Sequence, residues 1–350
     1  MEIHLIIIFK LITSLYSNKV DFQQFYIMEI FLSHNDYYNH KNKQLKSFIE
    51  SLNDNSIVKD RNFFLNALEK NGLALQYFDD IYKSDYEIVL AAVRSDSNAL
   101  QFAAASLKKN RSIVLEALKN NCFAFEYADD SLKKDKQMVL EAIEYYGYPL
   151  QFANNSLKKD KEIILKAIRY DGDAFQFADE TLKNDRDFII EVVNVNGTAL
   201  EFAADVYKKD KEVVERAVKS DGLGIIYADS LFRTNRDFVL MAVKSNGRVL
   251  QYLEPPFKTD PEITLEAIKC VPSAFEFADI SFKKDKNFVL KFIEDNPVTL
   301  RFVDDSLKAD KDIVLAALKK SKSKRIIQYI DKSLQNDSEI LKAIKLINRD

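Results

Sequence analysis

Two sets of side chains recur at equal spacing in this sequence, and each could bind a partner. The first is a ladder of amide and carboxylate groups, which could hold an extended peptide backbone through side-chain hydrogen bonds: Gln76, Gln101, Glu126, Gln151, Gln176, Glu201, Gln251 and Glu276. The second is a ridge of lysines, which could attract a polyanion such as nucleic acid or an anionic lipid surface: Lys109, Lys134, Lys159, Lys209 and Lys284.

No catalytic constellation accompanies these sets. The histidines are His4, His34 and His40, so the rest of the chain lacks the usual general base and cannot form a Ser-His-Asp or Cys-His arrangement. Phosphate-binding glycine loops, the H-E-x-x-H motif and paired C-x-x-C motifs are absent. Paired carboxylates such as Asp129 and Asp130 recur at one point of successive units, which favours a solvated edge over an acid/base pair. We expect a non-enzymatic protein without cofactor or metal.

Composition narrows the choice of partner and compartment. The chain has 350 residues, of which 47% are hydrophobic and 30% are charged, with a formal net charge of −3. This near balance makes nucleic acid a less favoured partner than a protein or peptide. Cys122 and Cys270 fit no metal or redox spacing, which indicates a reducing, cytoplasmic location. No segment is apolar enough to cross a membrane, and we expect a monomer.

The N-terminal residues leave two questions open. The apolar run at residues 5–9 is interrupted by Lys10, and Glu2 stands where a secretory signal needs positive charge. Secretion through a weak signal therefore remains the alternative to a cytoplasmic location. The start of the protein could be Met1 or Met28.

Both sets follow from an internal repeat of 25 residues. An Asp or Asn recurs in every repeat, and we call it position 0 and number the following residues from it. It is found at Asp60, Asp85, Asn110, Asp135, Asp160, Asp185, Asp210, Asn235, Asp260, Asp285 and Asp310, with a twelfth copy at Asp337 after a step of 27 residues. The ladder occupies position 16 and the lysine ridge position 24.

The repeat reads as two helices. Positions 3, 4, 7 and 8 are mostly apolar, which predicts a first helix of about ten residues capped by the position 0 side chain. Position 12 is glycine in six repeats, which we interpret as a left-handed residue ending this helix. Apolar residues at positions 14, 15, 17, 18 and 22 predict a second helix of about seven residues. Position 17 is Phe or Tyr in ten successive repeats, and packing in the core is favoured over a stacking platform for bases.

The segment DKEIILKAIRYDGDAFQFADETLKND at residues 160–185 resembles the repeat of the DUF4116 family, a domain of unknown function. The resemblance covers most of the chain from residue 60 to residue 348. It implies tandem helical repeats and carries no catalytic motif or assigned activity. The repeat from Asn235 to Asp260 departs from the pattern at Leu253-Glu254-Pro255-Pro256, which predicts a local kink or an altered groove.

These observations predict an all-α fold, an α-solenoid of about eleven 25-residue two-helix repeats, because neither helix can bury its apolar face alone. We expect an N-terminal extension or weakly signal-like segment at residues 1–27 and a capping region with a degenerate repeat at residues 28–59. Tandem repeats then fill residues 60–337, and a C-terminal capping helix lies within residues 338–350. The predicted function is a protein–protein interaction scaffold, and the alternative is polyanion binding along the lysine ridge.

Overall fold

The computed structural model describes residues 61–321 and 323–347, without the side chains of residues 62 and 63. The predicted regions 1–27 and 28–59 therefore lie outside the described residues. Every regular element in the described part is a helix, and none is a strand. None of the described helices combines the length and the apolar character needed to cross a bilayer.

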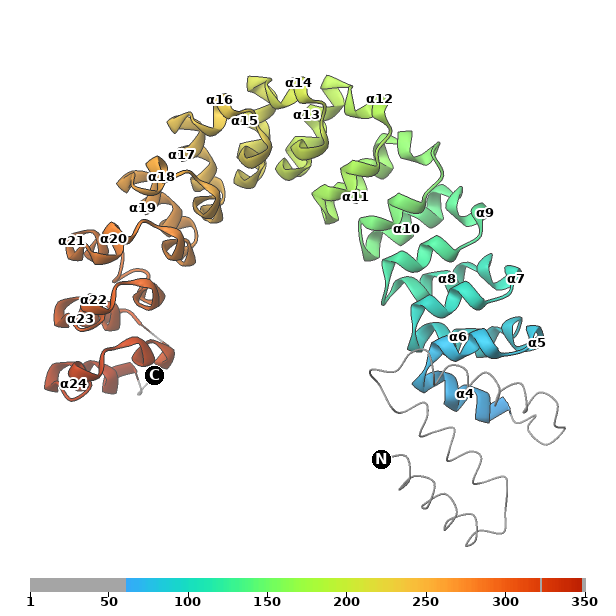
Figure 1. The fold of residues 1–350 in the computed structure, drawn as a ribbon, viewed down its shortest axis with the longest axis horizontal. Helices are drawn as coiled ribbons and strands as arrows, with labels where there is room; N and C mark the ends of the chain where they lie inside the picture. The colour runs from blue at the N-terminus through green and yellow to red at the C-terminus, as the bar shows by residue number, and fades with distance from the viewer. Residues whose placement is uncertain (1–60, 322, 348–350) are drawn as a thin grey trace, which may run out of the picture. The chain divides into compact units, whose positions relative to one another are not determined.

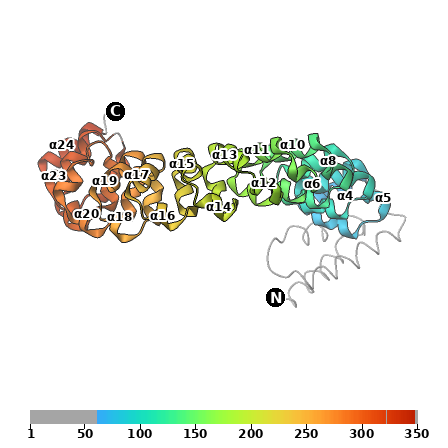
Figure 2. The same cartoon turned by 90° about the horizontal axis from the view of Figure 1, so that it is seen from above.

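The chain divides into two compact units, residues 1–170 and residues 171–350. In each unit the repeats follow one another as stacked layers, with the short helices on one side of the long ones (Figures 1 and 2). The all-α repeat architecture predicted from the 25-residue period is confirmed.

Each repeat begins with an α-helix, which spans up to ten residues. In the N-terminal unit these helices are α4 (Arg61–Lys70), α6 (Tyr86–Ser95), α8 (Arg111–Leu118), α10 (Lys136–Tyr145) and α11 (Lys161–Tyr170). In the C-terminal unit they are α13 (Arg186–Val195), α15 (Lys211–Ser220), α17 (Arg236–Ser245), α19 (Pro261–Cys270), α21 (Lys286–Leu290), α23 (Lys311–Lys319) and α24 (Ser338–Ile347).

A 3₁₀ helix follows, at positions 12–17 in most repeats, while η4 begins at position 13 and η12 lies two residues later. The N-terminal unit contains η1 (Gly72–Tyr77), η2 (Ser97–Phe102), η3 (Cys122–Tyr127) and η4 (Tyr148–Phe152). The C-terminal unit contains η6 (Gly172–Phe177), η7 (Gly197–Phe202), η8 (Gly222–Tyr227), η9 (Gly247–Tyr252), η10 (Pro272–Phe277), η11 (Pro297–Phe302) and η12 (Lys324–Tyr329).

A short helix then completes the repeat. In the N-terminal unit these are α5 (Asp80–Lys83), α7 (Ala105–Lys108), α9 (Asp130–Lys133) and η5 (Leu157–Lys159). In the C-terminal unit they are α12 (Glu180–Lys183), α14 (Asp205–Lys208), α16 (Ser230–Arg233), α18 (Pro255–Lys258), α20 (Ile280–Lys284), α22 (Asp305–Lys308) and η13 (Lys332–Leu334).

The second predicted helix is thus divided into two pieces. In the repeat that starts at Asp210, Ala228 and Asp229 are extended and separate η8 from α16. The Asp229 carboxylate accepts a hydrogen bond from the Leu231 N–H at 3.0 Å and so begins a new helix. A run of apolar residues with helical spacing conceals this break, because the extended residue at position 18 is itself buried.

Side-chain caps at positions 0, 11 and 19 organise the backbone, although several repeats lack the cap at position 11 or 19. In the same repeat, Asp210 accepts hydrogen bonds from the N–H groups of Glu212 and Val213, and Asp221 accepts one from Leu223. The position 0 cap was predicted, and the caps at positions 11 and 19 were not. Successive repeats are also tied by the backbone, since the Asp229 N–H donates to the Lys208 carbonyl at 2.9 Å.

The core is built from positions 3, 4, 7 and 8 of the long helices together with positions 14, 15 and 18. In α11, for example, Ile163, Ile164, Ala167 and Ile168 are fully buried. Each such layer buries its apolar face against the neighbouring repeat, which is the energetic basis of a solenoid.

The interpretation of the position 12 glycines as left-handed residues is wrong. None of the glycines whose surroundings are described, Gly222 among them, has a positive φ. The glycine is needed because the next repeat lies against it. A Cβ atom on Gly222 would lie 2.1 Å from the carbonyl oxygen of Ala242. Position 12 therefore sets how closely two layers approach.

At residues 253–256, where the sequence predicts a local kink or an altered groove, α18 occupies the same register as the other short helices. Pro255 and Pro256 stand at its first two positions, where no intrahelical N–H donor is needed.

Candidate interaction face

The ladder residues occupy equivalent places in the stacked 3₁₀ helices. Within each unit, every 3₁₀ helix packs against the next, so their position 16 side chains follow one another. The ladder side chains are all half-exposed or exposed. The amides of Gln101 and Gln176 donate to the carbonyls of Asn98 and Asp173 in their own helices, at 3.0 and 2.9 Å. These hydrogen bonds use the amide nitrogens, so the amide oxygens can accept hydrogen bonds from a partner.

Lysines at position 23 donate hydrogen bonds to the backbone carbonyls of the ladder residues. Lys133 donates to the Glu126 carbonyl at 2.7 Å and Lys158 to the Gln151 carbonyl at 2.8 Å. The same contact recurs at Lys183, Lys258 and Lys283. Burial lowers the pKa of Lys158 below its usual value. These ammonium groups satisfy carbonyls at the end of the 3₁₀ helix, so they orient the ladder residues.

The aromatic side chains at position 17 lie at the margin of the core rather than inside it, as the prediction had placed them. The rings from Tyr77 to Phe302 are largely covered but not fully buried, except that of Tyr252, which is 56% exposed. Fully buried rings in these 3₁₀ helices stand at position 15 instead, as at Phe175 and Phe275. A 3₁₀ helix has about three residues per turn, so positions 12 and 15 face the core while positions 13 and 16 face solvent. A side chain at position 17 therefore lies between the core-facing side and the solvent-facing side of the 3₁₀ helix.

We call the side chains at positions 13, 16 and 17 the 3₁₀ face. In the N-terminal unit it combines aromatic and amide groups, and Glu126 is the only carboxylate among its ladder residues. In the C-terminal unit the 3₁₀ face includes the carboxylates of Asp173 and Glu201. Burial, together with Asp171 and Glu201, raises the pKa of Asp173 above its usual value. Burial and a hydrogen bond with Glu201 raise the pKa of Tyr227 to about 12.

The predicted lysine ridge is exposed, but acidic groups accompany it. Lys109 lies 4.0 Å from Asp129, and Lys284 lies 3.9 Å from Asp304. Both carboxylates sit at position 19 of the following repeat, where they also cap the short helix. Lys134, Lys159 and Lys209 hold the same register in their repeats. The geometry brings together a mixed-charge edge rather than a purely basic track.

A second series of ion pairs joins successive repeats at position 1. Arg186 lies 2.8 Å from Asp210 and 2.9 Å from Glu212. Arg236 makes the equivalent pairs with Asp260 and Glu262, at 2.8 and 2.6 Å. The hydrogen bond from Arg186 holds the pKa of Asp210 below its usual value. Basic groups at this position are therefore engaged in repeat–repeat contacts.

Replacing Asp210 with asparagine is expected to lower stability at neutral pH and to matter less in acid. Asparagine can still cap, as Asn235 does in the next repeat, but it cannot pair as a charge with Arg186. A carboxylate whose folded pKa is lowered stabilises the fold above its unfolded pKa of about 3.9, and loses this contribution as the pH falls through the folded pKa. Urea unfolding at neutral pH and at about pH 3 measures the difference.

Asp210→Ala serves as the comparison for this prediction, because it removes the cap as well as the charge and should cost about 1 kcal/mol more than Asp210→Asn. A pH-independent difference between the parent chain and Asp210→Asn would contradict the assigned role of the ion pair.

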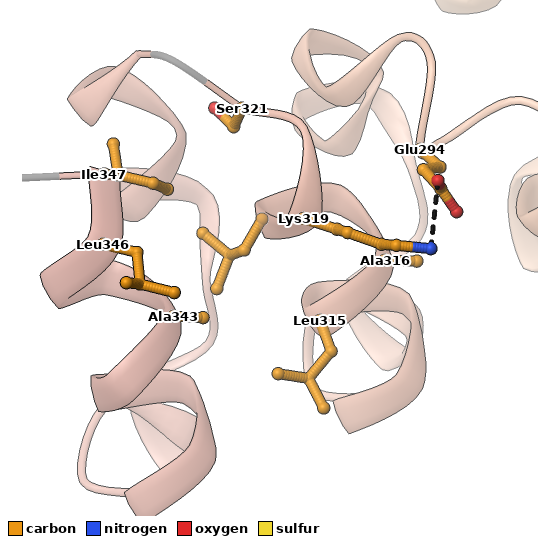
Figure 3. Close-up of a pocket in the computed structure, with 9 residues that line it drawn as sticks. Glu294, Leu315, Ala316, Lys319, Ser321, Ala343, Leu346 and Ile347 are labelled. Carbon is orange, nitrogen blue, oxygen red and sulfur yellow. Dashed lines mark ion pairs between the residues drawn. The ribbon is translucent and has the colours of Figure 1, made fainter. Parts of the chain in front are cut away.

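A groove lies at the C-terminal end of the stack, between α23 and α24 (Figure 3). Its volume is about 520 Å³, and Leu315, Ala343 and Leu346 are among its apolar lining residues. The ion pair between Lys319 and Glu294, at 3.1 Å, closes one side. Leu346 is 64% exposed. Glu294 and Lys319 are the titratable residues that line the groove. The groove therefore does not contain the two neighbouring carboxylates expected of an acid/base site.

Within the part of the chain that the structure describes, no three His, Cys, Asp or Glu side chains gather as a metal site requires. The geometry defines a helical-repeat protein whose regular face combines rings and amides. The model of DUF4116, a domain of unknown function, matches at residues 60–108, 110–158, 160–208, 210–258, 260–308 and 288–335, and each match spans about two 25-residue repeats. The chain belongs to this family. No curated protein and no solved structure matches it.

Proposed function

We propose that this chain is a non-enzymatic scaffold that binds an extended segment of a partner protein along the 3₁₀ face. The observation that carries the proposal is the half-exposed aromatic stripe at position 17 beside the ladder at position 16. Rings supply contact area at low entropic cost, and amides supply hydrogen bonds to a peptide backbone. Aromatic residues are enriched in protein interfaces for this reason.

Two further features support a protein partner over a polyanion. The ridge lysines Lys109 and Lys284 have carboxylates of the next repeat beside them, Asp129 and Asp304. Other basic groups, Lys158 and Arg186 among them, contact backbone carbonyls or neighbouring carboxylates. Ion pairs and hydrogen bonds of this kind already use the charge that phosphate groups would need. We place this activity in the cytoplasm and assign it to the monomer.

Selection of displayed random peptides against residues 1–350 tests the proposal. The ladder variant changes all eight ladder residues to alanine and so removes three carboxylates. We expect selected peptides to bind the parent chain and to bind the ladder variant at least about tenfold more weakly, which corresponds to about 1.4 kcal/mol. Their affinity should change little with salt.

The matched control removes the same number of carboxylates from exposed positions outside the 3₁₀ face. It carries alanine at exposed position 20 residues, namely Asp130, Asn155, Glu180, Asp205, Ser230 and Ile280. Its affinity for the selected peptides should equal that of the parent chain. Equal loss in both variants, or binding to single-stranded nucleic acid that falls steeply with salt and requires the ridge lysines, would overturn the proposal.

A further inference from the structure

The groove between α23 and α24 differs in chemistry from an equivalent hollow in the same unit. That hollow lies between α13 and α15, has a volume of about 470 Å³ and has polar walls, formed by Asn194, Glu212, Glu215, Arg216, Lys219 and Ser220. In the groove, Leu315 and Ala316 of α23 occupy the positions that Glu215 and Arg216 hold in α15. One wall of the groove is therefore apolar where the equivalent wall is charged.

The other wall, α24, also departs from the repeat. Position 9 of the long helix is a charged residue or an asparagine in the eleven preceding repeats, but it is Leu346 in α24. Leu346 is 64% exposed, so burial does not explain the exchange. Figure 3 shows Ala343 of this helix and Leu315 of α23 pointing into the space between the two helices. A local rule broken without structural compensation is expected at functional sites.

The walls of the groove select the conformation of an occupant. Both are sides of α-helices, whose backbone N–H and C=O groups point along the helix axis toward one another and not outward. Of the polar lining side chains, Lys319 and Glu294 pair with each other, and the Ser321 hydroxyl donates to the Ser323 carbonyl. An extended segment would bury peptide groups here without gaining hydrogen-bond partners. A helix satisfies its own backbone and can place apolar side chains in such a groove.

Charge selects the composition of that helix. Residues 311–347 contain nine Lys and Arg residues and four Asp and Glu residues, whereas the whole chain has a formal net charge of −3. Glu339, at the start of α24, pairs with Lys311 at 3.0 Å. Lys342 and Lys345 of the same helix are exposed, and among the described residues no carboxylate pairs with either of them. Carboxylates on the occupant would complement these free ammonium groups.

We propose that the groove between α23 and α24 binds an acidic amphipathic helix of a partner protein. The apolar side chains of that helix fill the groove against Leu315, Ala343 and Leu346. Its carboxylates meet Lys342, which lies one turn before Leu346 on the same side of α24. This site is separate from the 3₁₀ face, so the inference goes beyond the proposed function and does not depend on it.

Selection from a displayed library of alanine-rich helical peptides against residues 1–350 tests the inference. The peptides have about 18 residues, long enough to form a helix, with leucine, serine, glutamate and lysine randomised at the remaining positions. Selected peptides should carry leucines at i, i+3 or i+4, and i+7, and more glutamate than lysine. In fluorescence anisotropy, a selected peptide should bind at least about tenfold more tightly than its copy with lysine in place of every glutamate.

Two variants of the groove should weaken this binding about tenfold or more. Leu346→Asn gives α24 the position 9 residue of α13, and Leu315→Glu with Ala316→Arg gives α23 the side chains of α15. Each exchange uses residues found at the same positions of other long helices, and circular dichroism confirms that the variants are folded. Leu341→Asn is the matched control, because Leu341 is a 40% exposed leucine of α24 that does not line the groove. Its affinity should equal that of the parent chain.

Unchanged affinity in both groove variants, or selected peptides without an excess of acidic residues, would overturn the inference. Binding to phosphatidylserine vesicles that falls equally in Leu341→Asn and Leu346→Asn would replace it with docking on an anionic membrane. Self-association of the parent chain that Leu346→Asn abolishes would make a second copy the occupant. The ladder variant should bind the helical peptides as the parent chain does, so failure of the scaffold proposal would leave this inference in place.

Discussion

Gly222→Ala is expected to destabilise the C-terminal unit by about 1–3 kcal/mol or more, the usual cost of forcing extra volume into a packed interior. The new Cβ would lie 2.1 Å from the Ala242 carbonyl oxygen and 3.0 Å from the Asn246 nitrogen. Both contacts are to backbone atoms, so rotation of a side chain cannot relieve them. The layers of η8 and α17 must therefore move apart. Urea unfolding and amide hydrogen exchange in α15 and α17 measure this effect.

Ser97→Ala is the control for this prediction, because it changes the same position in another repeat. Position 97 already carries a Cβ, and its hydroxyl is buried without a hydrogen-bond partner. Removing an unsatisfied buried hydroxyl should raise stability by about 1 kcal/mol. If Gly222→Ala proved neutral, position 12 would not set the approach of the layers in this unit.

Phe275→Ala should be strongly destabilising, by about 3–5 kcal/mol, because it leaves a cavity that the packed layers cannot fill. Phe275 is fully buried in η10, and its ring lies 4.9 Å from that of Phe292 in the next repeat. The loss should concentrate at this junction, since each repeat contacts only its neighbours. Hydrogen exchange should show faster opening of α19 and α21 than of α13.

Phe277→Ala provides a matched control two residues further along the same helix. Phe277 is half-exposed at position 17, so its truncation should cost much less, about 1 kcal/mol. Comparable losses in the two variants, measured by urea unfolding, would show that position 17 is part of the core after all.

The long helices could be predicted because their cause is local. An Asp or Asn at position 0 satisfies the first N–H groups, and the apolar pairs at positions 3, 4, 7 and 8 have the helical period. Asp210 and the buried face of α15 show both features in the structure. The stacking followed from the 25-residue period, because equal units that cannot bury their own faces must bury them against one another.

The second half of the repeat could not be read correctly from its apolar residues. Positions 14, 15, 17 and 18 fit both an α-helix and a 3₁₀ helix, and the two place a side chain at position 17 differently. Capping Asp or Asn residues at positions 11 and 19, such as Asp221 and Asp229, were available signals of two short helices. Without them, the half-exposed rings were assigned to the core.

The sequence alone thus determined the period, the all-α class, the first helix of each repeat and the regular spacing of the ladder and the ridge, since these depend on local caps and on the order of apolar residues. Tertiary structure decided which rings reach solvent, which lysines are already engaged by carbonyls or carboxylates, and why Gly222 and the equivalent glycines have no room for a Cβ atom. These features arise from contacts between residues about one repeat apart, such as Gly222 with Ala242 and Arg186 with Asp210. The sequence shows that such residues recur, but it does not show which atom of the next repeat each of them contacts.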